Sequence, residues 1–488
     1  MLDYKRDALW IFIFLAMIFA YFFQDPGANG NSRVGLIFSF VQNGHLNIDA
    51  FQDREGTQTV DKSFYNGHFY SDKAIGTALL GSMIYFPIYK LAQFFGFAIN
   101  IWQYKRILTF TVIGIPAAFA GSLVFVLCKY LTGSKLQSFL ITIAGAIGTI
   151  YFPFSTLFFS HALAGSLLFC ALFMIFKLKV IPDISSINLH LFIIGFLLGF
   201  SIITEFPTVL IVVPLIIYFY FVFAPKKTIQ HILTGSILPI IGGVIPIIIL
   251  MIYNSLCFGN PLSIGYMYEN NQTYSTAQSQ GLMGIHLPNL KVLYYLTVNP
   301  YMGLFWQSPV LLLSLSGFYF MFRNRQYRGE AVMIGVSFLF YLLMNSGYFQ
   351  WWGGGSSGPR HLIPILLFLT LPLAFLPRRL NFLAIIFGCM SIAQMFIITA
   401  TSALAPNLIV DQLNAMRFFA YSNIYSFCLQ QLISGNIAYN LGNGILHLKG
   451  WISLVPILLV TLGVIGVFVM MGSKPTKISL PFLDRSKN

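Results

Sequence analysis

The amino-acid sequence predicts an all-α, polytopic membrane protein with about 12 to 13 transmembrane helices. Composition is the first reason: 57% of the 488 residues are hydrophobic and 9% are charged, whereas soluble domains are about 25% charged. The second reason is a series of apolar runs long enough to cross the roughly 30 Å of hydrocarbon in a bilayer. The third is the placement of Lys and Arg in short clusters beside these runs, as is typical of cytoplasmic flanks.

Twelve apolar runs are predicted to cross the membrane: 8–24, 107–128, 136–152, 155–176, 188–204, 206–224, 231–253, 302–322, 330–348, 362–377, 380–402 and 451–472. A further run, 74–97, contains Pro87 and Lys90. A full crossing there would place basic clusters on both sides of the membrane, so we expect a juxtamembrane or re-entrant helix on the outer side. Lys105 and Arg106 are then external, although Lys and Arg in membrane proteins usually flank the cytoplasmic ends of spans.

This topology places both chain ends in the cytoplasm and segments 25–106, 254–301, 349–361 and 403–450 outside. We treat residues 1–488 as one integral membrane domain with a large first extracytoplasmic loop. The net charge of +14 is divided among short flanking clusters, and no single basic face is formed, so we do not expect a nucleic-acid partner.

The first external loop, residues 25–76, is the candidate active site, because six of the fourteen acidic residues lie in it. Acid/base chemistry needs ionisable groups close together at a water-accessible surface. Apolar residues at helical spacing predict an amphipathic helix on the bilayer within 31–49. Farther along, a turn at Asn66 and Gly67 predicts a hairpin that brings the pairs Asp61-Lys62 and Asp72-Lys73 together.

Polar residues near the outer ends of later spans are further candidates. His161 lies near the outer start of the predicted span 155–176, and Glu205 lies in the TEFP turn between the predicted spans 188–204 and 206–224. An ionisable group at the membrane is costly unless it is paired or hydrated, which favours a functional role for Glu205. The glycine-rich turn of Tyr348 to Pro364 ends in Arg360 and His361. Glycines allow backbone to approach a ligand, and arginine can bind phosphate with two hydrogen bonds.

Several motifs together resemble a known family, the polytopic C-type (GT-C) glycosyltransferases that use polyprenyl-phosphate-linked sugars. The resemblance is to protein O-mannosyltransferases and lipid A aminoarabinose transferases, and it covers most of the chain. It rests on SR, NID, TVDK and YSDKA in the first loop and on FSHALAG, TEFP, YNSLCFGNPLSIGY, YMGLFWQSP and WWGGGSSGPRHLIP. A departure is Gly30, Asn31 and Ser32 before Arg33, where aminoarabinose-type relatives carry an acid.

The resemblance implies an extracytoplasmic active site in the plasma (inner) membrane of a prokaryote. A carboxylate of the first loop then acts as base or organises the acceptor; we expect Asp61 first, then Asp72, then Asp49. Lys73 resembles the family's phosphate-binding lysine, and Arg360 and Arg33 are the other expected phosphate ligands. Glu205, His161 and His361 are expected to line the cavity, and whether they hold a divalent metal is left open.

The resulting hypothesis is transfer of a sugar from a polyprenyl-phosphate donor, the lipid partner, to a lipid, glycan or protein acceptor during cell-envelope glycan biosynthesis. The alternative is a transporter or flippase of a lipid-linked saccharide. Transporters usually place polar residues at mid-membrane on broken helices, often in two related halves. Here the ionisable residues gather toward the outer face and no repeat is evident, which favours the enzyme. The sequence does not identify the sugar or the acceptor.

Overall fold

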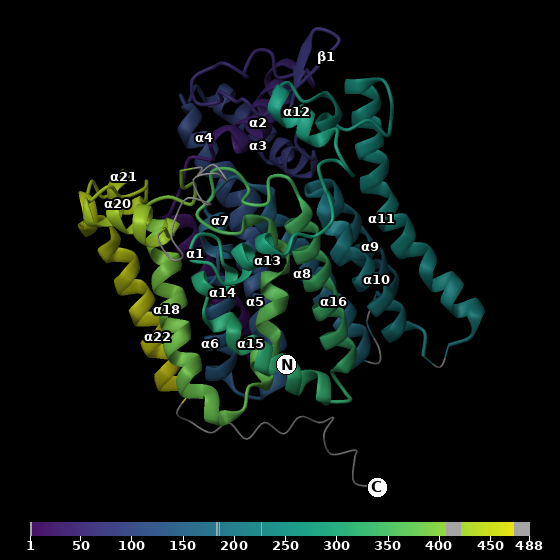
Figure 1. Ribbon diagram of the computed structural model, residues 1–488, viewed down its shortest axis with the longest axis vertical. Coiled ribbons are helices and arrows are strands. Elements are labelled where there is room, and N and C mark those ends of the chain that lie inside the picture. Colours follow the sequence, from purple (N-terminus) through teal and green to yellow (C-terminus); the bar gives the residue numbers. More distant parts are fainter. Residues whose placement is uncertain (1, 182–183, 185, 226, 407–420, 473–488) are drawn as a thin grey trace.

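The computed structural model describes residues 2–181, 184, 186–225, 227–406 and 421–472. Within these ranges the regular structure is helical apart from one two-stranded hairpin. The expected external segment 403–450 includes residues 407–420, which lie outside the described residues. The helices form a long bundle covered at one end by an outer layer (Figure 1).

The long helices of the bundle run mainly along its length (Figure 1). The bounds of the bundle's helices are α1 (Leu2–Tyr21), α5 (Ile115–Thr132), α6 (Lys135–Ala146), α7 (Tyr151–Ser155), α8 (Ser160–Val180), α9 (Ile187–Thr204), α10 (Val209–Phe223), α11 (Ile229–Phe258), α13 (Leu290–Thr297), α14 (Leu304–Gln307), α15 (Val310–Arg323), α16 (Arg328–Gly347), η5 (Arg360–Ile365), α17 (Leu366–Thr370), η6 (Leu371–Phe375), α18 (Asn381–Ala400), α20 (Leu429–Ile433), α21 (Leu441–Gly444) and α22 (Val455–Gly472).

The outer layer is built mostly from the first loop and from the segment after α11 (Figure 1). Its elements are α2 (Gly27–Phe38), η1 (Ser39–Asn43), β1 (Ser63–Tyr65), β2 (His68–Tyr70), α3 (Gly76–Phe95), α4 (Ile101–Leu108), η4 (Gly265–Tyr268) and α12 (Gln272–Gln278). This layer holds most of the residues that the sequence analysis singled out.

Eight helices of the described chain are long and apolar enough to cross a membrane, and the protein is an all-α integral membrane protein, as predicted. The other four of the twelve predicted spans are not among these eight. The predicted span 8–24 holds α1, which has 20 residues, and 136–152, 302–322 and 362–377 contain only shorter helical pieces. Proline explains the interruptions in the last two: Pro309 separates α14 from α15, and Pro364 and Pro372 lie in the 3₁₀ turns on either side of α17. Proline cannot donate the backbone hydrogen bond that continues an α-helix.

The first predicted helix of the loop is present but does not lie on the bilayer surface. It begins at Gly27, and η1 extends it until Gly44, which has φ of +71°, ends it. Residues 30–39 are buried on every side. The interpretation as a surface helix was therefore wrong: its polar residues, including Asn31, Ser32 and Arg33, are buried because they turn toward a polar interior.

The predicted hairpin is confirmed, with its turn at Asn66 and Gly67. Ser63 pairs with Tyr70, and Tyr65 pairs with His68. Of the pairs Asp61-Lys62 and Asp72-Lys73, three side chains come together and Lys62 does not join them. Lys73 contacts both Asp61 and Asp72, whereas the ammonium of Lys62 points to Gln52 and Asp53.

The run 74–97 forms α3, which packs beside α2 and α4 in the outer layer and is not one of the eight helices that could cross a membrane. Its last turns expose large apolar side chains: Phe86 is 54% exposed and Phe94 is 81% exposed. Such exposure fits the juxtamembrane position expected from the sequence.

The two basic residues that contradict the positive-inside bias are both engaged in contacts. Lys105 is fully buried, and its Nζ donates to Asp25 Oδ1 at 2.7 Å and to Asn31 Oδ1 at 3.0 Å. The guanidinium of Arg106 lies 3.5 Å from the ring centroid of Tyr439. Their charges therefore hold α4 against the start of the first loop and against the segment that carries Tyr439.

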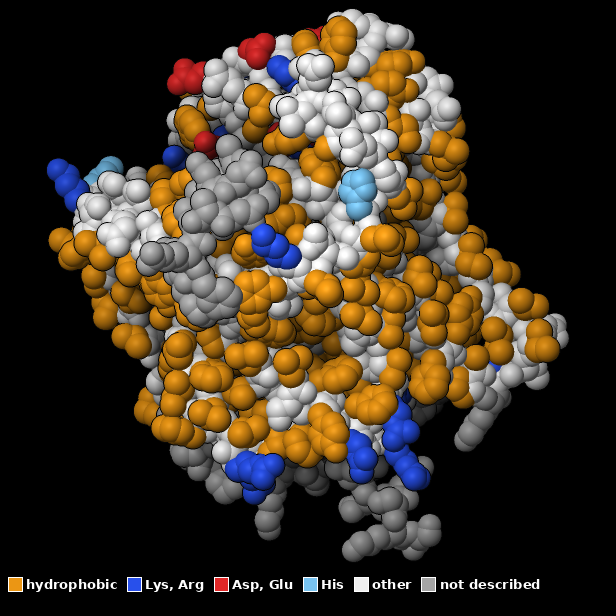
Figure 2. All heavy atoms as spheres, viewed as in Figure 1, with side chains coloured by type: hydrophobic (Ala, Val, Ile, Leu, Met, Phe, Trp, Pro, Cys, Tyr) orange, Lys and Arg blue, Asp and Glu red, His pale blue; other side chains and the backbone are white. Residues whose placement is uncertain are grey.

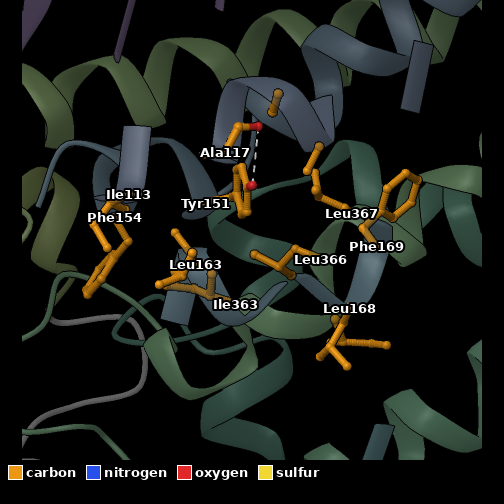
Figure 3. Close-up of a cluster of buried hydrophobic side chains, with 14 of the residues drawn as sticks. Ile113, Ala117, Tyr151, Phe154, Leu163, Leu168, Phe169, Ile363, Leu366 and Leu367 are labelled. Carbon is orange, nitrogen blue, oxygen red and sulfur yellow. Dashed lines mark hydrogen bonds between the residues drawn. The ribbon is translucent and has the colours of Figure 1, made fainter. Parts of the chain in front are cut away.

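A hydrophobic cluster under the outer layer joins α8 to η5 and α17 (Figure 3). Leu163 and Phe169 of α8 point toward Ile363 and Leu366, and all four are fully buried. At Gly165 a Cβ atom would lie 3.1 Å from Pro364 Cα, so the small residue permits this close approach. The cluster thereby fixes the start of α8 against the start of η5.

Charged side chains are unevenly distributed on the face shown in Figure 2. Acidic side chains lie at the outer layer, a broad hydrophobic band lies below it, and Lys and Arg lie at the opposite end as well as, in smaller number, at and just below the outer layer. This distribution is the pattern expected of a bundle whose outer layer faces away from the cytoplasm.

Labelling of introduced cysteines tests this orientation. We expect Asp53→Cys, in the outer layer, and Arg325→Cys, between α15 and α16, to react with a membrane-impermeant maleimide from opposite sides of a sealed vesicle. Both positions are exposed. The background should carry Cys389→Ser, because Cys389 is exposed. Labelling of both positions from the same side would contradict the topology.

Candidate active site

Side chains from separate parts of the chain line one polar cavity of about 280 Å³. The first loop, the start of α8, the end of α9, the segment after α11 and the glycine-rich turn before η5 all contribute to its wall. Of the nine expected site residues, all but Asp49 lie at this cavity: Arg33, Asp61, Asp72, Lys73, His161, Glu205, Arg360 and His361. The fold therefore joins motifs that are far apart in the sequence.

Lys73 lies between two carboxylates at the wall of the cavity. Its Nζ is 2.9 Å from Asp61 Oδ2 and 2.6 Å from Asp72 Oδ2. The side chains of Lys73 and Asp72 are 9% and 2% exposed, and that of Asp61 is 16% exposed. Asp61 is thus the more accessible partner.

These three charges change one another's protonation. Burial favours neutral Lys73, but the two carboxylates outweigh it and hold the lysine pKa well above its usual range. Burial likewise favours protonated Asp61, but the charge and hydrogen bond of Lys73 lower the pKa of that carboxyl. For Asp72 burial prevails, with the charge of Asp61 adding to it, and its pKa is raised.

Hydroxyl groups hold this cluster in place. Ser32 Oγ of α2 lies 2.8 Å from Ser71 Oγ and donates to Asp72 Oδ1 at 3.3 Å. Ser71 follows β2 directly, so the hairpin determines where Asp72 and Lys73 lie relative to the bundle. A buried ion pair is stable only when further hydrogen bonds satisfy its remaining polar atoms.

A second set of contacts crosses the cavity from α2 to α8 and α9. Arg33 Nη2 donates to Ser160 Oγ at 2.9 Å, and Ser160 Oγ donates to Glu205 Oε2. His161 Nδ1 is 3.2 Å from the same Glu205 oxygen. Glu205 is therefore not a lone carboxylate beside the membrane: it has partners that fix its orientation.

Arg360 enters the cavity from η5. Its guanidinium carbon lies 5.0 Å from the ring centroid of Phe159, and the residue is 9% exposed. Gly353, with φ of +78°, passes so close that a Cβ atom there would lie 2.7 Å from Arg360 Nε. Within the described residues, the Nε atoms of both Arg33 and Arg360 are buried without a hydrogen-bond partner. Both arginines thus keep donors for a ligand.

The two histidines face each other at the base of the cavity. The ring centroids of His161 and His361 are 5.4 Å apart, nearly perpendicular. Across the described chain, no group of three His, Cys, Asp or Glu side chains is arranged to hold a metal ion. Glu205, His161 and His361 line the cavity, as expected.

An apolar groove of about 640 Å³ adjoins the polar cavity. Its walls come mainly from α10, α16 and residues 264–285, and they include Leu210, Ile285 and Leu343. The two spaces share six lining side chains: Arg33, Glu205, Tyr266, Gln278, Tyr348 and His361. The polar cavity and the apolar groove thus border each other along these six side chains.

Asp49 has a different place in the structure. Its Oδ1 accepts a hydrogen bond from Phe69 N at 2.7 Å, and its Oδ2 is 2.7 Å from His68 Nδ1. It is not among the residues that line the cavity. Both contacts fasten the residue to β2, so its position fits a role in holding the hairpin.

The cavity residues to which the sequence analysis gave no role include Tyr266, Glu269 and Tyr348. Tyr348 begins the glycine-rich turn, and Tyr266 ends the motif YNSLCFGNPLSIGY, but the sequence analysis assigned neither residue a function. Glu269 follows that motif by three residues. The signal that was available is an acidic residue in an external segment with few others.

Two solved structures are similar to this chain, both of ArnT from Cupriavidus metallidurans. One is bound to undecaprenyl phosphate and has 13% sequence identity; the other is in the apo state and has 11%. Each match has a TM-score of 0.45 and covers 96% of this chain and 74% of the ArnT chain. The chain is similar to ArnT. No protein-family model matches the sequence, and no curated protein matches it.

The contact between Gly353 and Arg360 leads to a prediction with a matched control. We expect Gly353→Ala to displace the Arg360 guanidinium and to lower the free energy of unfolding by about 1 to 3 kcal/mol more than the control, the usual cost of overpacking. Gly67→Ala is the control, because Gly67 has φ of +85° but open space around it. Thermal unfolding of the purified protein should separate the two. Equal loss in both variants would show that backbone strain alone is responsible.

Proposed function

We propose that this protein is a membrane glycosyltransferase that moves a sugar from a polyprenyl-phosphate donor to an acceptor at the extracytoplasmic face. The observation that carries the proposal is the shared edge between the cation-lined polar cavity and the apolar groove. A lipid-linked sugar needs both, because its headgroup is charged and polar while its chain is long and apolar.

The phosphate of such a donor fits the cationic side of the cavity. Lys73, Arg33 and Arg360 approach it from the hairpin, from α2 and from η5. The bound phosphodiester carries one negative charge, and the phosphate gains a second when the bond to the sugar breaks. Cations fixed in advance stabilise that developing charge without having to reorganise.

The reaction is then a displacement at the anomeric carbon with inversion. The acceptor hydroxyl oxygen forms a bond to this carbon, and the bond from the carbon to the phosphate oxygen breaks with its electron pair staying on oxygen. A carboxylate of the cavity accepts the hydroxyl proton. The products are the glycosylated acceptor and polyprenyl phosphate.

Buried charges elsewhere favour this enzyme over the flippase alternative. At the other end of the bundle, Asp7 pairs with Lys129 at 2.8 Å and Lys135 at 2.7 Å, and Lys179 pairs with Glu330 at 2.5 Å. These charges pair with one another between helices. A flippase would instead need polar groups available along a path through the bundle.

Turnover by the purified protein tests the proposal. The protein in nanodiscs should be incubated with a panel of undecaprenyl-phosphate-linked pentoses, hexoses and aminosugars, with lipid and glycan acceptors. We expect release of undecaprenyl phosphate with at least one donor. Movement of intact donor between leaflets, without release from any donor, would instead support the flippase.

Loss of the phosphate ligands gives a second prediction. Removing one partner of a buried charge contact costs about 2 to 5 kcal/mol, so Lys73→Ala and Arg360→Ala should each weaken undecaprenyl phosphate binding by about 30-fold or more. Lys90→Ala is the matched control, because Lys90 is an exposed cation on α3. Unchanged binding in both cavity variants would remove these residues from the phosphate site.

A further inference from the structure

Glu269 reaches the cavity from the segment after α11, beside the hairpin of the first loop. It lies just after η4 and is 7% exposed. Its backbone forms a bridge with Ser63 at the start of β1, and the next residue, Asn270, donates its N–H to Lys62 O at 3.0 Å. The segment after α11 is thereby joined to the hairpin that carries Asp72 and Lys73.

The carboxyl of Glu269 differs from the other three in the cavity. Asp61 and Asp72 are both bound to Lys73, and Glu205 is held by Ser160 and His161. For Glu269, the described residues supply one hydrogen bond, from its neighbour Asn271 N to Oε1 at 3.2 Å. The backbone of Lys62 is hydrogen-bonded to Asn270, the residue after Glu269. The ammonium of Lys62, however, points away from Glu269, and its Nζ lies 3.6 Å from Asp53 Oδ1.

We propose that Glu269 is the general base, which takes the proton from the acceptor hydroxyl. The inference rests on the proposed glycosyl transfer. The base must stand beside the bound phosphate without being neutralised by the cations that hold it. Glu269 meets this requirement, since it shares the cavity with Lys73 and has no ion pair within the described chain.

The step balances without any further reactant. As the acceptor oxygen bonds to the anomeric carbon, its proton passes to Glu269. The electron pair of the breaking bond stays on the phosphate oxygen. After the products leave, Glu269 returns the proton to water.

The basicity of the carboxyls agrees with this assignment. Burial, followed by the charge of Asp72, raises the pKa of Glu269 to about 8, while Lys73 opposes the shift. Lys73 instead lowers the pKa of Asp61. A general base is most effective when its pKa lies near the working pH, so Asp61 is the weaker candidate.

The pH dependence follows from this difference. A base works in its deprotonated form, so turnover should rise with pH as Glu269 loses its proton, nearly tenfold per unit below about pH 7, and should level off above about pH 8. If Asp61 were the base, its carboxylate would already be charged in this pH range, and turnover would not change with pH. His161 and His361 share the cavity, so the Glu269 variant must be compared to isolate the contribution of the glutamate.

The experiment compares Glu269→Gln with Asp61→Asn and Asp72→Asn in one single-turnover assay. The exposed Glu55→Gln is the matched control. The assay uses the donor from the undecaprenyl-phosphate sugar panel that wild type turns over, and undecaprenyl phosphate binding is measured beside it. We expect Glu269→Gln to lose about 10²- to 10⁴-fold in rate, to bind undecaprenyl phosphate normally and to lose the rise with pH.

Glu269→Asp keeps a carboxylate and should retain both activity and the rise with pH, which covers the case that the Gln variant does not fold. Glu269→Gln with the rate and pH profile of Glu55→Gln would overturn the assignment while leaving the glycosyltransferase intact. A flat wild-type profile between pH 6 and 8 would also overturn it. If wild type neither binds undecaprenyl phosphate nor releases it from any donor, the proposed function itself fails.

Discussion

Burying Lys73 between two carboxylates is the constraint on which the outer layer depends. Removing one member of a buried ion pair typically costs about 3 to 5 kcal/mol, because the other charge is left without compensation. The cluster therefore needs a surrounding structure that cannot relax. Ser32 and Ser71 supply hydrogen bonds from two directions, and the hairpin, α2 and the segment after α11 are all packed around the same few atoms.

Charged side chains at the cavity are paired to different degrees. Lys73 is paired with Asp61 and Asp72 at hydrogen-bond distance, as Asp7 is with Lys129 at the other end of the bundle. Arg33 and Arg360 instead each keep a buried Nε donor without a partner among the described residues. Buried donors are normally paired, so unpartnered donors beside a cavity are candidates for ligand contacts.

The sequence predicted the membrane class, the hairpin turn and the charged residues of the cavity other than Glu269, because hydropathy, turn chemistry and charge are local properties. It failed where tertiary contacts decide. Residues 31–38 have a helical apolar pattern typical of a surface helix, yet burial depends on Ser160 and Asp72, which are distant in the chain. Asp49 looked equivalent to Asp61 in composition, and only the pairing of β1 with β2 turns it toward Phe69 N. Glu269 was overlooked because the segment that carries it reaches the hairpin only in three dimensions.

The apolar groove also determines how substrate would reach the cavity. Val209, Leu282 and Phe340 line it and are 42%, 74% and 45% exposed, so the groove opens onto the apolar side of the molecule. A lipid entering there would not have to leave the bilayer. Encounter would then occur by diffusion in two dimensions, and occupancy would follow the mole fraction of the lipid in the membrane. Diluting that membrane with detergent or inert phospholipid would slow capture even at constant bulk concentration.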